Sequence, residues 1–150
     1  MTSYGFRVYG NPTPQGSKVP GVSSKGKLFV REQAGEKLVS WRQAVKEAAK
    51  TACEGINTIT GPVTLRISFL VPRPASVSEK KRPYPTVAPD LDKLIRGVGD
   101  ALKEAGVYRD DSQVVCIQAT KRYAGSKIDD AAGAWIVISE VPPGGSLPLL

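Results

Sequence analysis

Four aspartates bracket one stretch near the middle of the chain, "APDLDKLIRGVGDALKEAGVYRDDSQVV". Asp90 and Asp92 stand one residue apart at its start, and Asp110 and Asp111 are adjacent near its end. Carboxylate oxygens without histidine or cysteine favour a hard cation, either Mg²⁺ or Mn²⁺. Such an ion can activate water and neutralise charge on a phosphodiester. If the acids converge, they predict metal-dependent phosphodiester hydrolysis.

Ordinary structural roles also account for each pair. Asp is a favoured helix N-cap and is stabilised in a first helical turn, and Asp92 can pair with Arg96 one turn later. Asp110 and Asp111 suit a polar turn between a helix and a strand. The pairs would lie roughly 20 Å apart along the helix. They meet if the chain turns back, if the next strand carries an acid partway along the helix, or if a second subunit supplies a group.

The composition favours a polyanionic partner, nucleic acid first. Lys and Arg number 21 against 14 Asp and Glu, which gives a net charge of +7. The chain has no histidine, and its two cysteines, Cys53 and Cys116, form no CxxC pair. A structural zinc site, a histidine general base and a Ser-His-Asp triad therefore lack their parts. Both cysteines are expected to be buried free thiols in a reducing compartment.

The length of 150 residues predicts one small domain, residues 1–140. The tail, residues 141–150, is rich in Pro and Gly and is expected to be disordered. No apolar run approaches the roughly 20 residues of a membrane span. The N-terminus has no signal-peptide pattern. These features predict a cytoplasmic protein without a membrane partner.

Hydrophobic periodicity predicts an α/β (α+β) fold with a mixed sheet and two main helices. The predicted strands cover 4–10, 27–30, 63–71, 112–124 and 133–141, and the predicted helices cover 36–53 and 90–105. Residues 11–27, rich in Pro, Gly, Ser and Lys, predict a loop. The order is thus strand, hairpin, helix, strand, helix, strand, strand.

Each predicted helix has one apolar face. Trp41 falls in the stripe of the first helix, so we interpret it as core rather than as a platform for stacking bases. Gly106 supplies the stop of the second helix, whose interior contains Gly97 and Gly99. The predicted core positions are Leu38, Trp41, Val45, Ala48 and Ala52 in the first helix and Leu91, Leu94, Ile95, Val98, Leu102 and Ala105 in the second.

The segment before the second helix, "PRPASVSEKKRPYPTVAPD", interleaves prolines with basic residues and cannot form a regular element. One interpretation is a solvated linker. Its position directly before Asp90 favours the other, a basic arm beside a site.

The stretch "PDLDKLIRGVGDALKEAGVYRDDSQVV" resembles the RusA family of Holliday-junction resolvases, small endonucleases of bacteria and phages. The family pattern is approximately Pro-Asp-x-Asp-Asn-Leu, a helix that ends in Asp-Ala-Leu, a Gly-hydrophobic-aromatic step, and then Asp-Asp and a strand. Asp100-Ala101-Leu102, Gly106-Val107-Tyr108 and Asp110-Asp111 match by position, and "KRY" after the strand also fits. Lys93 replaces the usual Asn, and Ala88 replaces a common basic residue.

The resemblance implies a Mg²⁺-dependent homodimer that resolves four-way junctions by paired, symmetric cuts in DNA recombination and repair. It implies that Asp90, Asp92 and Asp111 bind the metal and prime water. Arg96 stands where the family usually has a catalytic lysine, and we expect it to stabilise charge on the phosphate. It also implies a bacterial host cell and a phage or prophage origin.

Basic residues near these acids are expected to track the DNA backbone. They are Arg73, Lys80, Lys81, Arg82, Lys93, Lys121 and Arg122. Two other functions stay open. One is a non-catalytic nucleic-acid-binding protein whose aspartates serve only as helix caps and turn residues, and the other is a nuclease for flaps or replication forks. Whether Asp110 also contacts the metal is open too.

Overall fold

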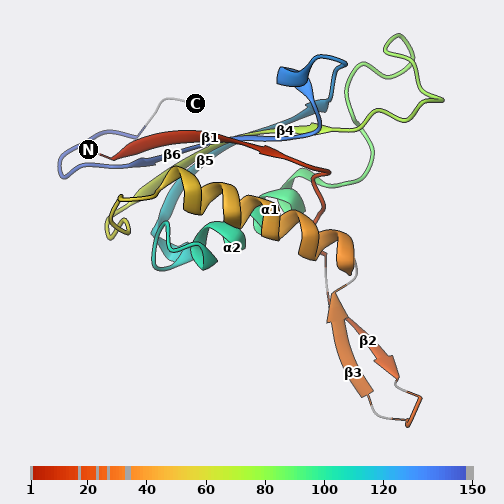
Figure 1. Cartoon of the computed structure of the whole chain (residues 1–150), viewed down its shortest axis with the longest axis horizontal. Coiled ribbons are helices and arrows are strands. Elements are labelled where there is room, and N and C mark those ends of the chain that lie inside the picture. The colour runs from red at the N-terminus through yellow and green to blue at the C-terminus, as the bar shows by residue number, and fades with distance from the viewer. Residues whose placement is uncertain (1, 17, 23, 27, 33–34, 148–150) are drawn as a thin grey trace.

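The computed structural model describes residues 2–16, 18–22, 24–26, 28–32 and 35–147. It shows a mixed four-stranded sheet with two helices on one face, which confirms the predicted α+β class (Figure 1). The elements are β1 (Ser3–Tyr9), β2 (Lys18–Val22), β3 (Leu28–Glu32), α1 (Glu36–Ala52), β4 (Val63–Val71), α2 (Leu91–Glu104), the 3₁₀ turn η1 (Asp111–Gln113), β5 (Val114–Tyr123), the 3₁₀ turn η2 (Ile128–Asp130) and β6 (Gly133–Glu140).

The strand order of the main sheet is β1-β6-β4-β5. β6 pairs antiparallel with β1 and β4, while β4 and β5 are parallel. Parallel strands need a long crossover connection, and here α2 makes it. The crossover carries the loop of residues 72–90 at one end of the sheet and the 105–113 turn at the other. The four aspartates lie in these two connections and in the first turn of α2.

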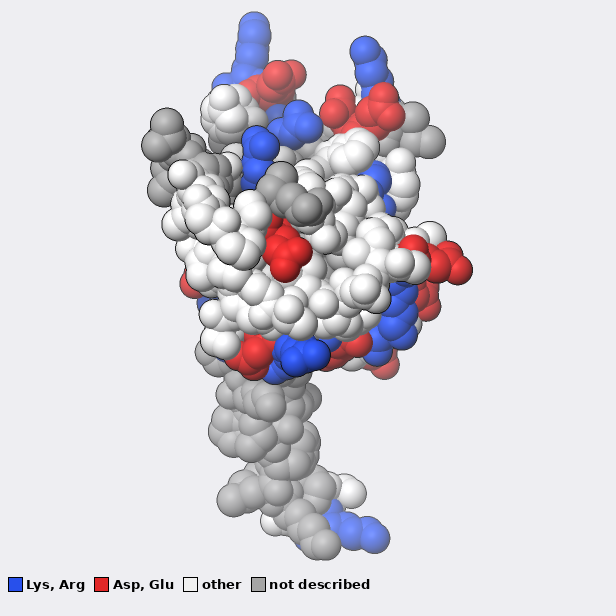
Figure 2. Space-filling view, turned by 90° about the vertical axis from the view of Figure 1, so that its left-hand side faces the viewer, with Lys and Arg blue, Asp and Glu red and all other residues white. Residues whose placement is uncertain are grey.

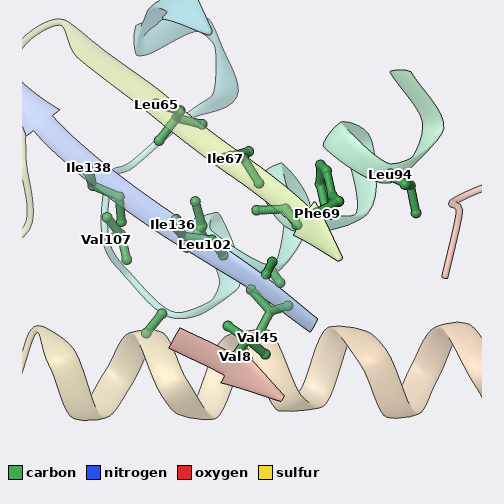
Figure 3. Packing of buried hydrophobic residues seen from close by; sticks show 14 of the residues in the cluster. Val8, Val45, Leu65, Ile67, Phe69, Leu94, Leu102, Val107, Ile136 and Ile138 are labelled. Carbon is green, nitrogen blue, oxygen red and sulfur yellow. The ribbon is translucent and has the colours of Figure 1, made fainter. Parts of the chain in front are cut away.

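The core fills the space between the sheet and the helices (Figure 3). Alternate residues of β4 and β6 point toward α1 and α2, as period-two patterning predicts. Trp41 is 2% exposed, which confirms it as a core residue. Ala49 is buried, whereas Ala48 and Ala52 are half-buried. The predicted apolar face of α1 is therefore correct in the first half of the helix, whereas near its end the buried position is Ala49 instead of Ala48.

The two interior glycines of α2 have separate packing reasons. A Cβ on Gly97 would lie 3.6 Å from the Thr13 carbonyl oxygen and 3.8 Å from Leu38 Cδ1. A small residue there lets α2 close onto α1 and onto the loop after β1. The carbonyl of Gly99 accepts a hydrogen bond from the Tyr108 hydroxyl at 3.1 Å. Gly97 thus serves helix packing, and Gly99 faces the turn that follows the helix.

The prediction of a loop over residues 11–27 is wrong in part, because β2 lies inside it. β2 pairs with β3 as an antiparallel hairpin, and the hairpin projects from the body as an arm (Figure 1). Pro20 within β2 suggested a loop, yet proline is tolerated in a strand that has an open edge. Residues 17, 23 and 27 of the predicted loop lie outside the described residues.

Cys53 and Cys116 are free, as expected, but half-buried rather than buried. The predicted tail begins with an ordered contact, because the Val141 amide donates to the Pro62 carbonyl at 2.8 Å. Residues 148–150 of that tail lie outside the described residues. Neither helix in the described part of the chain has the length and apolar character that a membrane span requires.

Replacement of Gly133 by alanine should unfold much of the sheet. Its φ is +148°, and a Cβ would lie 1.9 Å from the Val8 carbonyl oxygen on the neighbouring strand β1. We expect Gly133→Ala to lower the free energy of unfolding by at least about 3 kcal/mol in urea denaturation. Gly55→Ala is the matched control, since its φ is +77° with open space around it. It should cost only about 1 kcal/mol. Equal losses in the two variants would contradict the clash.

Candidate active site

A cavity of about 290 Å³ lies between α2 and the start of β5, and it brings Asp111 beside the middle of the helix. Arg96 and Asp100 of α2 line the same cavity. The chain therefore turns back after α2, and Asp111 comes to lie partway along the helix. The remaining lining residues are Leu65, Ile95, Gly99, Tyr108, Val114 and Ile117.

Tyr108 fixes this geometry. Its ring is 1% exposed, and its hydroxyl donates to the Gly99 carbonyl of α2. The Val107 amide donates back to the Leu102 carbonyl at 3.1 Å, and the Ile59 amide donates to the Val107 carbonyl at 2.9 Å. Because the turn is bound both to the helix and to the core, Asp111 has little freedom to move away from Asp100.

The adjacent aspartates have different environments. The Asp110 carboxylate accepts hydrogen bonds from the amide and the hydroxyl of Ser112 and lies 3.5 Å from the Lys103 ammonium. Gln113 completes a capping box, because its Oε1 accepts from the Asp110 amide at 2.9 Å. Asp110 is thus occupied as the cap of η1, whereas no hydrogen bond or ion pair is formed by the Asp111 carboxylate within the described residues.

These environments shift the two pKa values in opposite directions. The Ser112 hydrogen bonds, and then the Lys103 charge, lower the pKa of Asp110. Although Asp111 is exposed as a residue, partial burial of its carboxyl group raises its pKa, and the negative charge of Asp100 raises it further. The cavity therefore brings Asp111 close to a second acid, Asp100, whose negative charge repels that of Asp111. A bound cation would relieve this repulsion.

Asp90 and Asp92 lie at the other end of α2. Asp90 occupies the N-cap position, but its side chain makes no capping hydrogen bond and lies 3.6 Å from the Lys93 ammonium. Asp92 is exposed, and no ion pair joins it to Arg96 in the described chain. The capping role that would have explained Asp90 is therefore not used.

Asp92 and Asp100 are eight residues apart on one helix, about 12 Å along its axis. Mg²⁺–oxygen distances are only about 2.1 Å. One ion therefore cannot be bound by both Asp92 and Asp100 of the same chain. Consistent with this, the described residues contain no group of three or more His, Cys, Asp or Glu side chains that could hold a metal.

Lys121 holds the start of α2 in place. Its ammonium donates to the carbonyls of Val87 and Pro89, at 2.9 and 2.8 Å. These two carbonyls lie directly before Asp90. Because Lys121 is on β5, the sheet itself positions the segment that carries Asp90 and Asp92.

Two arginines of the 72–90 loop are also bound internally. The Arg73 guanidinium lies 4.1 Å from the centre of the Tyr123 ring and donates to the Arg82 carbonyl at 2.7 Å. Arg82 Nε donates to the Tyr123 hydroxyl at 2.7 Å. The loop is therefore folded against the end of β5 instead of being a free linker, and it extends beyond the sheet in Figure 1.

The other predicted DNA contacts differ in availability. Lys80 and Lys81 are exposed in the loop, and their ammonium groups form no hydrogen bond or ion pair in the described chain. Lys93 pairs with Asp90, and Arg122 lies 3.8 Å from Asp130. At the opposite end of the molecule, acidic and basic side chains mix along the lower margin of a mostly uncharged surface (Figure 2). A single basic face is not present there.

The sequence prediction did not single out Asp100 as a site residue. The signal was available, since Asp100 follows Arg96 by four residues and so shares its helix face. Arg96 itself forms no ion pair in the described residues, so its guanidinium is available to an anion. The oxygen-only donors suit Mg²⁺ or Mn²⁺ chemically, but one chain brings just two of them together in the cavity.

Comparisons with known proteins show the family of this chain. The family model described as "Endodeoxyribonuclease RusA" matches residues 10–129. An uncharacterized protein of Bacillus subtilis (strain 168), YqaN, is 37% identical over 128 residues, which cover 79% of this chain and 87% of that protein. The crossover junction endodeoxyribonuclease rusA of Lactococcus phage r1t is 29% identical over 119 residues, or 77% of this chain and 84% of that protein. The family match spans all four aspartates and the cavity between α2 and β5, so the chain belongs to the RusA family of endodeoxyribonucleases.

Proposed function

We propose that this endodeoxyribonuclease is a Mg²⁺-dependent homodimer that resolves Holliday junctions by paired, symmetric hydrolysis, in DNA recombination and repair. The observation that carries the proposal is the shared cavity of Asp111, Asp100 and Arg96. It combines acids for a hard cation with a cation for a phosphate. The phage relative named as a crossover junction endodeoxyribonuclease supports the branched substrate. The protein would act in the cytoplasm of a bacterial cell, encoded by a phage or prophage.

In this proposal Asp90, Asp92 and Asp111 hold the ion, and Asp100 supports Asp111. When bound, Mg²⁺ supplies an activated water and neutralises charge at the scissile phosphate; Mn²⁺ can do the same. Arg96 donates hydrogen bonds to the phosphate oxygens. Its guanidinium is a fixed cation, so its contribution is electrostatic.

A second copy of the chain brings the separated acids together. Asp92 and Asp100 lie about 12 Å apart along α2, too far to share one ion, and the described residues of one chain form no group of three or more acids that could hold a metal. β5 has one neighbouring strand in the described residues, and Val115 and Ile117 beside Asp111 are 49% and 41% exposed. Such an edge with apolar side chains favours contact with another chain. We therefore propose that the partner copy approaches along β5 and supplies its own Asp90 and Asp92.

The DNA backbone would be followed by Lys80 and Lys81, with Lys93 and Arg122 as further contacts. Arg73, Arg82 and Lys121 would act on DNA through the shape of the 72–90 loop, because their donors are bound to the chain itself. The loop begins at the end of β4 and ends at Asp90, so lysines on it can reach DNA that lies at the start of α2.

Conversion of single acids to amides separates catalysis from binding. Asp90→Asn, Asp92→Asn and Asp111→Asn should each lower the rate of junction nicking at least about 100-fold in Mg²⁺, because each removes a ligand of the ion. Binding of a labelled four-way junction in EDTA should be retained. Symmetric nicks are scored on denaturing gels.

Two conservative variants serve as controls. Asp110→Asn should keep most of the cleavage, because Asn also caps helices well. Asp129→Asn, exposed in η2, should behave like the wild type. Binding without cleavage by the wild type in any divalent ion would instead support the non-catalytic binder. Faster cleavage of flaps or forks than of junctions would support the other nuclease.

Because the pKa of Asp111 is raised, replacement of this carboxylate by an amide should stabilise the folded protein, and the gain should depend on pH. Ionised Asp111 is disfavoured in the folded protein, so its cost to stability begins as the pH rises above its unfolded pKa and is complete above its folded pKa. Without divalent ions, Asp111→Asn should raise Tm at pH 7. The difference should vanish below the unfolded pKa of about 4. A variant that is less stable than the wild type at pH 7 would rule out this electrostatic penalty.

Lys121→Met tests how the start of α2 is positioned. Loss of the two bonds to Val87 and Pro89 should raise the Mg²⁺ concentration for half-maximal cleavage at least about fivefold, since the acids are held less well. Junction affinity and its salt dependence should not change. Lys80→Met should instead leave the Mg²⁺ concentration for half-maximal cleavage unchanged. It should reduce the slope of log affinity against log salt concentration by about one. A reduced salt slope in Lys121→Met would make Lys121 a direct DNA contact.

A further inference from the structure

A group of aromatic and basic side chains lies on the face of the sheet that points away from the helices. Trp135 lies between the core residues Ala134 and Ile136 on β6, so its side chain points to the opposite face. Arg66 does the same between Leu65 and Ile67 on β4. Both α-helices lie on the core side, whereas the 3₁₀ turn η2 lies on the other side, near one end of the sheet, so the rest of this outer face is not covered by a helix in the described chain (Figure 1). The indole of Trp135 is 44% exposed there.

The indole is held in a fixed position by its neighbours. Arg7 is the direct partner of Trp135 across β1 and β6, and its guanidinium lies 5.6 Å from the Trp135 ring centre. The same guanidinium lies 4.6 Å from the ring centre of Tyr9, which is 55% exposed. Arg7 also donates to the carbonyls of Val8 and Ala131. The two aromatic rings thus share one anchored cation and form a preorganised aromatic platform.

A groove lined by both polar and apolar residues lies on the neighbouring strands β4 and β5. Trp135 pairs across the sheet with Ser68, and Ser68 pairs with Thr120, so the three side chains form one row. A cavity of about 460 Å³ lies beside Ser68 and Thr120 of this row. Its lining residues are Arg66, Ile67, Ser68, Ile117, Gln118, Ala119 and Thr120. The outward positions of the four strands also include Arg122 but no Asp or Glu. Arg66, which forms no ion pair in the described residues, therefore offers its positive charge to an anion, whereas Arg122 lies 3.8 Å from Asp130 of η2.

Other occupants fit less well. In a two-fold contact between copies of the chain the same patch would face itself, and Arg66 would meet a like charge. Duplex DNA keeps the faces of its bases stacked and so cannot use an exposed indole. Single-stranded DNA offers both a base face for stacking and a phosphate for a guanidinium.

We propose that the outer face is a second DNA-binding site, which takes unpaired, single-stranded DNA. A base stacks on Trp135, and Arg66 binds an adjoining phosphate. The side chains of Ser68 and Thr120 line the path of the strand. This site needs neither the metal-binding acids nor cleavage, so it stands apart from the active site proposed above.

Tryptophan fluorescence gives a direct test, because the only other tryptophan, Trp41, is buried. Titration with an oligothymidylate of about 12 nucleotides should quench the wild type in EDTA. Trp135→Ala should weaken binding of the fluorescein-labelled oligonucleotide about 5- to 150-fold. Its remaining Trp41 emission reports that the fold is intact. Arg66→Ala should reduce the salt slope of binding by about one.

Two further variants separate this site from the others. Val39→Ala removes an exposed apolar side chain from α1 and should leave oligothymidylate binding unchanged. Asp111→Asn should keep the quenching even where it abolishes junction cleavage. The proposal is overturned if Trp135→Ala binds oligothymidylate like the wild type, or if a duplex of equal length quenches equally. It is also overturned if Trp135→Ala changes only the molar mass in solution, which would make the face a contact between copies.

Discussion

Packing of α2 against the sheet is the constraint on which the active site depends. Leu94, Val98 and Leu102 are fully buried, so the rotation of α2 about its axis is set by the core. That rotation turns Arg96 and Asp100 toward the cavity at the start of β5. The buried Tyr108 then ties the returning chain to the Gly99 carbonyl. Burial of apolar surface, which is worth far more than any single charge contact, thus places the charged groups.

Neighbouring aspartates illustrate how a fold separates structural from chemical roles. Asp110 finds its partners within its own turn, and those partners favour its ionised form. Asp111, one residue later, faces another acid and has no compensating hydrogen bond in the described chain. Asp90 stands at a cap position without capping. An acid that leaves an available structural role unused is a stronger indication of ligand binding than an acid identified by spacing alone.

The basic residues divide in a similar way. Net charge of +7 indicated a polyanionic partner, but Arg7, Arg73 and Lys121 donate mainly to backbone carbonyls and aromatic rings of the chain. They shape surfaces on which other cations are free within the described residues. In our proposals these free cations contact DNA, and they are Lys80 and Lys81 beside the candidate active site and Arg66 on the outer face. The charge surplus is therefore partly structural.

The sequence by itself determined the helices, the strands of the main sheet and the motif that identifies the family, because these depend on local periodicity and on residue order. It did not reveal β2, since the prolines of that segment favour loops and its pairing with β3 is not local. It left open whether the aspartates meet. Only the tertiary structure decided that Asp111 adjoins Asp100 rather than Asp92, because the turn after α2 reverses the chain and the core sets the rotation of the helix.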